Sequence, residues 1–339
     1  MQPEISPLDP ADQPTVDAIQ QLRVAVEAVT VPDFPPPCPV EFRASLTHQV
    51  SFHRTERYVA RLDGVPAGYL TIGLPQRENQ EGASVGLAVH PDHRRRGVGR
   101  ALHAHLIQRL AELGRKRYYA DTVASLPDGP ERLVAGAEFA TAMGAKAALP
   151  EVRRRLDLTT VPEQVWRELG ASARSAAAGY QVVTWQDRTP DEYAADAGYL
   201  DGRLISDAPT GDLVLDAPVI DVSRLREKEA MLAAYQLRSY SAGAVHEQTG
   251  RLVALTTIGR QHNAPWHAWQ WITLVDPEHR GHRLGALVKV ANLQFALAHE
   301  PQLRVVDTWN AAVNEHMISI NEAMGFRPVD RWVSWQQEV

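Results

Sequence analysis

The chain has 339 residues, enough for about two domains of ordinary size. Its hydrophobic fraction of 44% and charged fraction of 22% are those of a soluble globular protein, and the net charge of −6 argues against a nucleic-acid partner. Cys38 is the single cysteine, which excludes an internal disulfide and a cysteine-based metal site. Because no signal peptide and no bilayer-spanning apolar run is evident, we expect a cytoplasmic protein without a membrane partner.

Hydrophobic periodicity predicts alternating strands and helices through the first half. Asp63-Gly64, between two apolar runs, is a strong hairpin signal, and the proline-rich stretch 31–39 cannot be regular helix. In chain order we expect an extended segment at 4–8, a helix around 16–26, strands at 57–62, 67–72 and 85–89, a helix at 100–113, a strand at 117–123, a helix at 131–143 and a strand at 152–158.

The second half follows a similar plan. Residues 162–178 are alanine-rich and helical, and we expect them to form a linker. After it the patterns predict a strand at 180–185, mostly helix at 191–241, a hairpin of 244–247 and 252–258, a strand at 269–275, a helix at 284–298, a strand at 304–309 and a helix at 316–324. Each half thus reads as a mixed sheet with helices on both faces, an α/β (α+β) fold class. The predicted domains are 1–160 and 180–339, with a helical linker at 161–179.

A thirteen-residue segment occurs twice, 186 positions apart: VHPDHRRRGVGRA at 89–101 and VDPEHRGHRLGAL at 275–287. Asp121-Thr122 and Asp307-Thr308 repeat at the same offset. The tripeptide AMG repeats at an offset of 181. A period this long is unlike that of a solenoid, whose units have roughly 20–50 residues. Matches in the same order indicate that a whole domain was duplicated.

Each copy of the segment follows an apolar strand and opens a helix. Glycines bare the backbone N–H groups at a helix N-terminus, and arginines add charge, so the turn suits an anion such as a pyrophosphate. An ordinary basic loop before a surface helix is the alternative for a single copy, and the second copy in register weighs against it. The P-loop signature is absent, and Leu102 stands where a dinucleotide-binding turn needs its third glycine.

The segment R-x-x-G-x-G at Arg94–Gly99, after the strand residues Leu87-Ala88-Val89, resembles motif A of the GNAT acyltransferases. In the second half Asn314 and the stretch INEAMGF at 320–326 resemble motif B of that family. A weaker counterpart, FATAMGA, lies at 139–145. The paired arrangement is similar to the tandem-GNAT proteins, the group that includes mycothiol synthase. The resemblance implies two GNAT-like domains in tandem.

The resemblance also implies acyl-CoA binding, with acetyl-CoA as the expected co-substrate and no metal. The backbone of Leu87 and Val89 would pair with pantetheine, and amides from Arg95 to Arg100 would hold the pyrophosphate. The acyl group would pass directly to an amine in a ternary complex. The cofactor-binding candidates are Leu87, Val89, Arg94, Arg95, Arg96, Gly97, Val98, Gly99, Arg100 and Ala101 in the first copy, and Val275, Arg280, Gly285 and Asn314 in the second.

The chain departs from the family pattern in both halves. The tyrosine that often protonates the leaving thiolate is replaced by Asn321 in the second half and by Ala140 in the first. In the second turn Arg283 replaces the first glycine, and its side chain would crowd or contact the phosphate. We therefore expect the first half to be the tighter cofactor site. Which half performs the chemistry stays open.

The candidate catalytic residues are Glu81, Tyr119, Asn314 and Asn321. A solvated carboxylate is the alternative for Glu81, and packing is the alternative for Tyr118 and Tyr119. His316 follows Asn314 and would titrate near neutrality, with a helix-surface histidine as its alternative.

Other catalytic patterns fit less well. Gln270, on the strand before the second turn, cannot accept a proton at neutral pH. The stretch GASVG at 82–86 matches the nucleophile elbow only formally, because a strand follows it rather than a helix. The pairs His90/His93 and His279/His282 lack a third metal ligand in sequence.

These observations favour an acyl-CoA-dependent N-acyltransferase that moves an acetyl group to the amine of a small molecule. One alternative is a non-catalytic acyl-CoA-binding sensor or scaffold, since neither half shows a clear acid and base. Another is a nucleotide-phosphate binder that imitates motif A. The acceptor cannot be read from the sequence, and both a monomer and a homodimer remain open.

Overall fold

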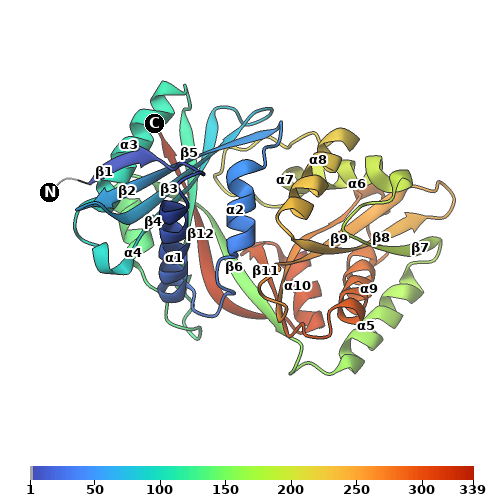
Figure 1. Cartoon of the computed structure of the whole chain (residues 1–339). Coiled ribbons are helices and arrows are strands. Elements are labelled where there is room, and N and C mark those ends of the chain that lie inside the picture. The colour runs from blue at the N-terminus through green and yellow to red at the C-terminus, as the bar shows by residue number, and fades with distance from the viewer. Residues whose placement is uncertain (1–2) are drawn as a thin grey trace. The chain divides into compact units, whose positions relative to one another are not determined.

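The computed structural model describes residues 3–339, which form two compact units that are each discontinuous in sequence. Unit 1 comprises the chain up to Glu151 together with Gly211–Leu215 and Asp330–Val339. Unit 2 comprises Val152–Thr210 and Asp216–Val329. Each unit is a mixed sheet covered by helices, so the predicted α/β class is confirmed (Figure 1). The division into domains 1–160 and 180–339, with a linker at 161–179, stays a prediction.

The sheet of unit 1 follows chain order. Its strands are β1 (Glu4–Pro7), β2 (His53–Leu62), β3 (Val65–Pro75), β4 (Gly82–Val89) and β5 (Arg117–Ser125), and the last part of β12 (Arg327–Glu338) pairs antiparallel with β5. The β2–β3 hairpin turns at Asp63 and Gly64, whose φ angles are +54° and +80°. Two left-handed residues make the turn that matches the twist of paired strands, so the hairpin signal is confirmed.

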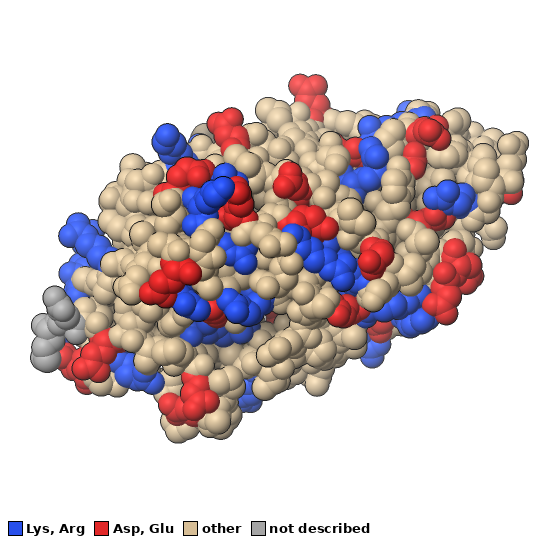
Figure 2. All heavy atoms as spheres, turned by 90° about the horizontal axis from the view of Figure 1, so that it is seen from above, with Lys and Arg blue, Asp and Glu red and all other residues tan. Residues whose placement is uncertain are grey.

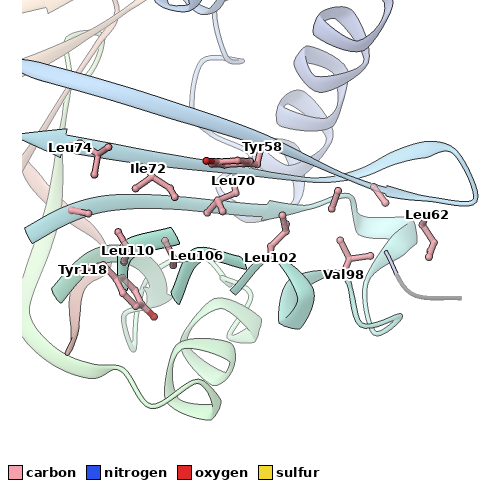
Figure 3. Close-up of a cluster of buried hydrophobic side chains, with 13 residues drawn as sticks. Tyr58, Leu62, Leu70, Ile72, Leu74, Val98, Leu102, Leu106, Leu110 and Tyr118 are labelled. Atoms are coloured by element: carbon pink, nitrogen blue, oxygen red, sulfur yellow. The ribbon is translucent and has the colours of Figure 1, made fainter. Parts of the chain in front are cut away.

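Helices cover both faces of this sheet. They are α1 (Gln13–Thr30), α2 (Pro39–Thr47), α3 (Val98–Glu112) and α4 (Ala135–Ala142). The buried side chains of α3 recur every fourth residue from Val98 to Leu110 and pack on Leu70 and Ile72 of β3 (Figure 3). Tyr69, which directly precedes Leu70, points to the other face and packs with α1. The alternation of strand residues thus gives unit 1 two cores on one sheet.

The sheet of unit 2 has a comparable plan. Its neighbouring strands are, in order, β7 (Tyr180–Gln186), β8 (Arg238–His246), β9 (Leu252–Arg260), β10 (His267–Val275), β11 (Val305–Ala311) and the part of β6 (Lys146–Asp157) that begins at Val152. Its helices are α5 (Glu163–Ala176), α6 (Ala194–Gly202), α7 (Leu204–Asp207), α8 (Val222–Ala234), α9 (Leu284–His299) and α10 (Glu315–Met324). The predicted linker is mostly α5, which packs through Trp166 and Ala173 into the core beside α9.

In both units two parallel strands separate shortly after they meet. In unit 1, β4 and β5 pair only over Gly82–Ser84 and Arg117–Tyr119. In unit 2, β10 and β11 pair only over His267–Trp269 and Val305–Asp307. Each first strand then runs on toward its copy of the repeated turn with one edge open. The duplication inferred from the sequence is therefore visible in the strand pairing.

Several element predictions are wrong. The stretch 191–241, expected to be mostly helix, contains α6, α7 and α8 with an irregular segment between α7 and α8. Its last residues, from Arg238, belong to strand β8. Helix α2 begins at Pro39, which sits at its first turn, where a proline costs nothing. Helix α4 starts at Ala135 and not at 131. No strand was expected at 327–338, where β12 lies.

The last strands of the two units come from unexpected parts of the chain. Asp330–Glu338, the C-terminal end of the chain, completes the sheet of unit 1 beside β5. The later part of β6, which follows unit 1 in sequence, lies beside β11 in unit 2. In each unit, therefore, the strand that lies beside β5 or β11 comes from a segment that is distant from that strand in sequence. Within residues 3–339, no helix has the length and hydropathy needed to span a bilayer.

Candidate functional site

The first copy of the repeated turn connects β4 to α3. After Val89 the chain makes a short 3₁₀ helix at Pro91–His93 and then enters the turn. Arg95 and Gly97 both have left-handed backbone, with φ angles of +62° and +84°. Helix α3 begins at Val98, directly after Gly97. The two left-handed residues reverse the chain so that the helix N-terminus faces the end of the open strand.

The second copy follows the same path between β10 and α9. Its 3₁₀ helix is Pro277–His279, and its two left-handed residues are Gly281 and Arg283, with φ angles of +88° and +54°. The glycine thus occupies the first left-handed position in this copy and the second in the other. A non-glycine residue in this conformation costs roughly 1–2 kcal/mol, so each turn carries one strained arginine. Arg283 preserves the turn although it replaces a glycine.

The first arginine of each copy fastens the turn to its strand. Arg94 Nε donates to the carbonyl oxygen of Val89 at 3.3 Å. Arg280 Nε donates to the carbonyl oxygen of Val275, also at 3.3 Å. These equivalent bonds close the loop over five residues and leave the strand carbonyl satisfied. Arg94 and Arg280 therefore have a structural contact beside the phosphate role predicted for them.

The last position of the R-x-x-G-x-G motif is a glycine in both copies, Gly99 and Gly285, because another element lies close to it. A Cβ added at Gly99 would lie 3.2 Å from the ring of Phe139 in α4 and 3.7 Å from Val89. A Cβ added at Gly285 would lie 3.3 Å from Ile320 in α10 and 3.8 Å from Val275. The same three elements meet at both glycines. A side chain there would push the helix away from the strand end.

The edge of β4 that faces away from β3 carries the backbone groups predicted to bind pantetheine. His90 N donates to Ala67 O, which places even-numbered residues of β4 in the hydrogen-bonded pairs with β3. In an antiparallel ladder the alternate residues point their N–H and C=O groups to the opposite side. Leu87 and Val89 therefore present these groups along the edge left open by β5. Their predicted contact with a cofactor is sterically possible.

The N-terminus of α3 is exposed and basic. No described side chain caps it, whereas Asp12 caps α1 and Asn314 caps α10. Arg95, Gly97 and Arg100 are exposed, and Arg96 contacts His93 at 3.3 Å. The first-turn N–H groups of a helix have no intrahelical acceptor and carry a partial positive charge. This end of α3, with Val98 and Ala101 in its first turn, suits a diphosphate.

The second turn is placed in different surroundings. The first residues of α9 from Leu284 to Ala286 are buried, and Arg283 Nη1 donates to Ser172 Oγ of α5 at 2.6 Å. His279 Nδ1 lies 2.9 Å from the Tyr180 hydroxyl, and the ring of His282 is 5.2 Å from that of Tyr180. The Arg283 side chain thus turns toward α5. Among residues 3–339, no cluster of three or more metal-ligating side chains forms a metal site.

Glu81 directly precedes β4, at the end of the strand remote from the turn. Its carboxylate makes ion pairs with Lys116 and with Arg117, the latter at 3.6 Å, and its side chain is 53% exposed. The hydrogen bond and charge of Lys116 lower the pKa of Glu81. A lowered pKa weakens a general base. These contacts fit the solvated-carboxylate alternative, and catalysis by Glu81 stays a prediction.

Tyr119 and a carboxylate that sequence reasoning missed lie on the later strands of unit 1. The Tyr119 hydroxyl donates to the carbonyl of Val214 at 2.6 Å. Glu151 is partly buried, and burial, followed by the charge of Asp121, raises its pKa. That is the direction a general base near neutral pH needs. Glu151 had no local sequence signal, because its pKa depends first on burial by the fold and then on Asp121 of another strand.

The motif B candidates of the second half have structural contacts. Asn314 is the N-cap of α10, where its side chain accepts from Met317 N at 3.2 Å. Asn321 is fully buried, and its Nδ2 donates to Asn310 Oδ1 of β11 at 2.7 Å. An asparagine amide does not supply a proton to a thiolate as a tyrosine does. Roles for Asn314 and Asn321 in binding or catalysis stay predictions.

A buried ionic cluster in unit 2 was also missed. Asp307 of β11 accepts from His267 Nε2 at 2.9 Å, from Arg153 at 3.1 Å and from Arg155 at 2.7 and 2.8 Å. Burial lowers the pKa of His267, against the opposing effect of Asp307. The one signal in sequence was the repeat itself, since Asp307 is the counterpart of Asp121. Its partners come from β6 and β10, which local patterns cannot pair.

Comparison with known proteins agrees with this geometry. A model of the GNAT acetyltransferase family matches residues 23–128. A solved tandem GNAT protein from the clavulanic acid biosynthesis pathway is 36% identical, with a TM-score of 0.82, over 99% of this chain and 98% of its own. The chain belongs to the GNAT acetyltransferase family. It is a tandem GNAT protein and an N-acetyltransferase, so the predicted family and enzyme class are confirmed.

More distant structures share the fold. A GNAT protein from Sphaerobacter thermophilus is 16% identical with a TM-score of 0.63, over 99% of this chain and 95% of its own. A putative acetyltransferase from Pyrococcus horikoshii is 15% identical with a TM-score of 0.53, over 100% of this chain and 90% of its own. Comparison with curated proteins gave no match.

On the face shown in Figure 2, basic and acidic side chains are interspersed, without a broad area of one sign.

Proposed function

We propose that this GNAT protein transfers an acetyl group from acetyl-CoA to the amine of a small molecule, in a ternary complex, with the co-substrate held by unit 1. The turn from Arg94 to Gly99 carries the proposal. Its two left-handed residues bring an exposed, uncapped helix N-terminus against the open edge of β4. The relative from the clavulanic acid biosynthesis pathway supports a small-molecule acceptor.

In this proposal the residues of unit 1 divide the binding of acetyl-CoA. The amides at the start of α3 hold the pyrophosphate, and the exposed Arg95 and Arg100 add charge-assisted hydrogen bonds to it. The outward N–H and C=O groups of Leu87 and the outward N–H of Val89 pair with pantetheine along the edge of β4. Gly99 keeps α3 close enough to the strand for both contacts to be made at once.

Catalysis rests mainly on placing the reactants. Holding an amine and a thioester in attack geometry can supply roughly 7–11 kcal/mol of barrier reduction. Backbone N–H groups of the open strand polarise the thioester carbonyl as charge develops on its oxygen. The positions of the usual acid hold Ala140 and Asn321, so we propose that the leaving thiolate takes its proton from water. Glu151, whose pKa is raised, is the carboxylate of unit 1 suited to accept the amine proton.

The matched glycines of the two turns allow a direct test. Gly99→Leu should abolish acetyl-CoA binding measured by calorimetry, because the added side chain collides with Phe139. Gly285→Leu makes the equivalent collision with Ile320 in unit 2 and should leave binding intact. Arg95→Glu, at an exposed residue, should weaken binding at least tenfold by placing a carboxylate at the phosphate site.

Unchanged affinity in both Gly99→Leu and Arg95→Glu refutes the placement of the co-substrate. Loss of binding only in Gly285→Leu assigns it to unit 2. Circular dichroism of each variant verifies the fold. Release of CoA with a panel of amines tests the transfer reaction itself, and acetyl-CoA binding without turnover on any amine would refute transfer to small molecules.

A further inference from the structure

A cavity of about 420 Å³ in unit 1 lies among α1, α2 and strands β2 to β4. Its wall includes Gly86, Leu87 and Ala88 of β4. These residues lie beyond Ser84, where β4 stops pairing with β5. The cavity therefore adjoins the stretch of β4 at which the proposed function places pantetheine. Its size suits a small molecule.

Two guanidinium groups line this cavity. Arg23 comes from α1 and Arg57 from β2. Arg23 Nη1 donates to Gln20 Oε1 at 3.1 Å, and Arg57 Nη2 donates to Ser45 Oγ at 3.1 Å. Both acceptors are neutral. The cavity thus brings two cations together through elements distant in sequence.

Packing fixes the position of Arg23. Its guanidinium carbon lies 4.6 Å from the centre of the Phe42 ring, which is buried. Burial lowers the pKa of Arg23, against the opposing effects of Tyr69, Glu41 and Glu27. A guanidinium with one face on a ring keeps N–H groups at its edge for an anion. The arrangement is pre-formed, so little side-chain entropy is lost on binding.

The charge of the lining favours a ligand with one negative charge. The charged side chains of the wall are Arg23, Arg57 and Glu27, so the lining carries a net charge of +1. Burial raises the pKa of Tyr69, so its hydroxyl stays neutral. An amine must be neutral to attack a thioester, and an amino acid in that state carries a net charge of −1. A phosphate monoester carries nearly twice that charge.

We propose that the acceptor is a primary amine that also carries a carboxylate, held by Arg23 and Arg57, with the amine directed toward Gly86–Ala88. The planar fork of a guanidinium matches the two oxygens of a carboxylate. This inference rests on the proposed function, because it assigns the cavity to the acceptor of that reaction. It narrows the substrate class to amino acids and related amino carboxylates.

The kinetic test compares α- and β-amino acids with their own carboxamides. The acid should exceed its carboxamide in kcat/KM by tenfold or more. Arg57→Gln and Arg23→Gln should raise KM for the acids by a similar factor, change KM for the carboxamides little and leave the Kd of acetyl-CoA unchanged. Arg54→Gln is the control on the same strand, since Arg54 pairs with Glu56 outside the cavity.

Binding measured without turnover separates this inference from the proposed function. Saturation-transfer NMR with N-acetyl amino acids and their carboxamides, in the presence of CoA, reports on the cavity even if no amine is acetylated. The inference is supported if the acids bind selectively and the substitution Arg57→Gln abolishes that binding. No binding of the acids, equal binding of the carboxamides, or a preference for 2-aminoethylphosphonate overturns it. Failure of acetyl-CoA to bind, with the acids still bound selectively, overturns the proposed function and leaves the cavity as a carboxylate-binding site without an acceptor role.

Discussion

Replacing Lys289 with methionine should stabilise the protein, and the gain should depend on pH. Lys289 lies on α9 with 1% of its surface exposed. Its Nζ is 5.4 Å from the centre of the Phe326 ring. Burial lowers the pKa of Lys289 from 10.5 to about 7. A methionine has a similar length without a charge to desolvate.

The size of the effect follows from the pKa. A drop from 10.5 to about 7 corresponds to about 5 kcal/mol, at 1.36 kcal/mol per pKa unit. The folded chain releases its proton near pH 7 and the unfolded chain near pH 10.5. Between these values the unfolded state binds more protons, so stability rises with pH by up to about 1.4 kcal/mol per unit. Below pH 7 the full penalty applies, and above 10.5 it vanishes.

Urea unfolding of the wild type and Lys289→Met near pH 7 and near pH 9.5 measures the difference. The free energy of unfolding of the variant should exceed that of the wild type by up to about 5 kcal/mol at the lower pH and by clearly less at the higher pH. The difference shrinks because only the wild type has a lysine at this position that loses its proton as pH rises. Lys228→Met is the control in the same unit, since Lys228 is 40% exposed and pairs with Asp201. A gain that is independent of pH, or a loss of stability near pH 7, refutes the reasoning.

Three further substitutions test the packing of the fold. Gln236→Gly should raise the free energy of unfolding by about 0.5–1 kcal/mol in urea titrations, because Gln236 follows α8 with a φ of +55°. Asp330→Asn should cost about 3 kcal/mol in the same assay, since it uncouples the buried pair in which Arg132 Nε lies 2.9 Å from Asp330. Burial raises the pKa of Asp307, but hydrogen bonds from Arg155 and His267 outweigh it and bring the pKa to about 2. The resulting stabilisation of about 2 kcal/mol is present above pH 3.8 and is lost as pH falls toward 2, so Asp307→Asn should flatten acid unfolding over that interval.

Local chemistry explains which parts of the fold the sequence predicted. The Asp63-Gly64 hairpin and the turn before α3 both depend on a glycine that adopts left-handed backbone, Gly64 and Gly97, and such glycines are visible in sequence. Helix α3 was predicted because its leucines recur at helical spacing. The family resemblance was carried by the same turn. Signals confined to about ten neighbouring residues were therefore sufficient for these elements.

The errors lie where distant partners decide the structure. Strand β12 pairs with β5, which lies over two hundred positions away in sequence. The sequence of β12 by itself does not indicate that partner. Strand β8 begins at Arg238 and is buried almost throughout, so the alternation that marks a half-exposed strand is missing. Residues 191–241 were predicted to be mostly helix, but an irregular segment that contains Gly211 and Pro218 lies between α7 and α8. The cavity with Arg23 and Arg57 likewise joins a helix and a strand that share no motif.

The two turns show that backbone shape and ligand binding are separate consequences of the duplicated motif. Both copies keep two left-handed residues, an arginine bonded to the strand carbonyl and a glycine pressed against the following helix. These contacts join a strand, a turn and a helix, so the fold itself requires them whether or not an anion binds. Charge and the exposure of the first helix residues are not required by the fold, and there the copies differ. The first has four arginines at 94–96 and 100, and at the corresponding positions the second has Arg280, Gly281, His282 and Ala286. The basic character of the first turn and the exposed start of α3 therefore point to a ligand more directly than the shape that both turns share.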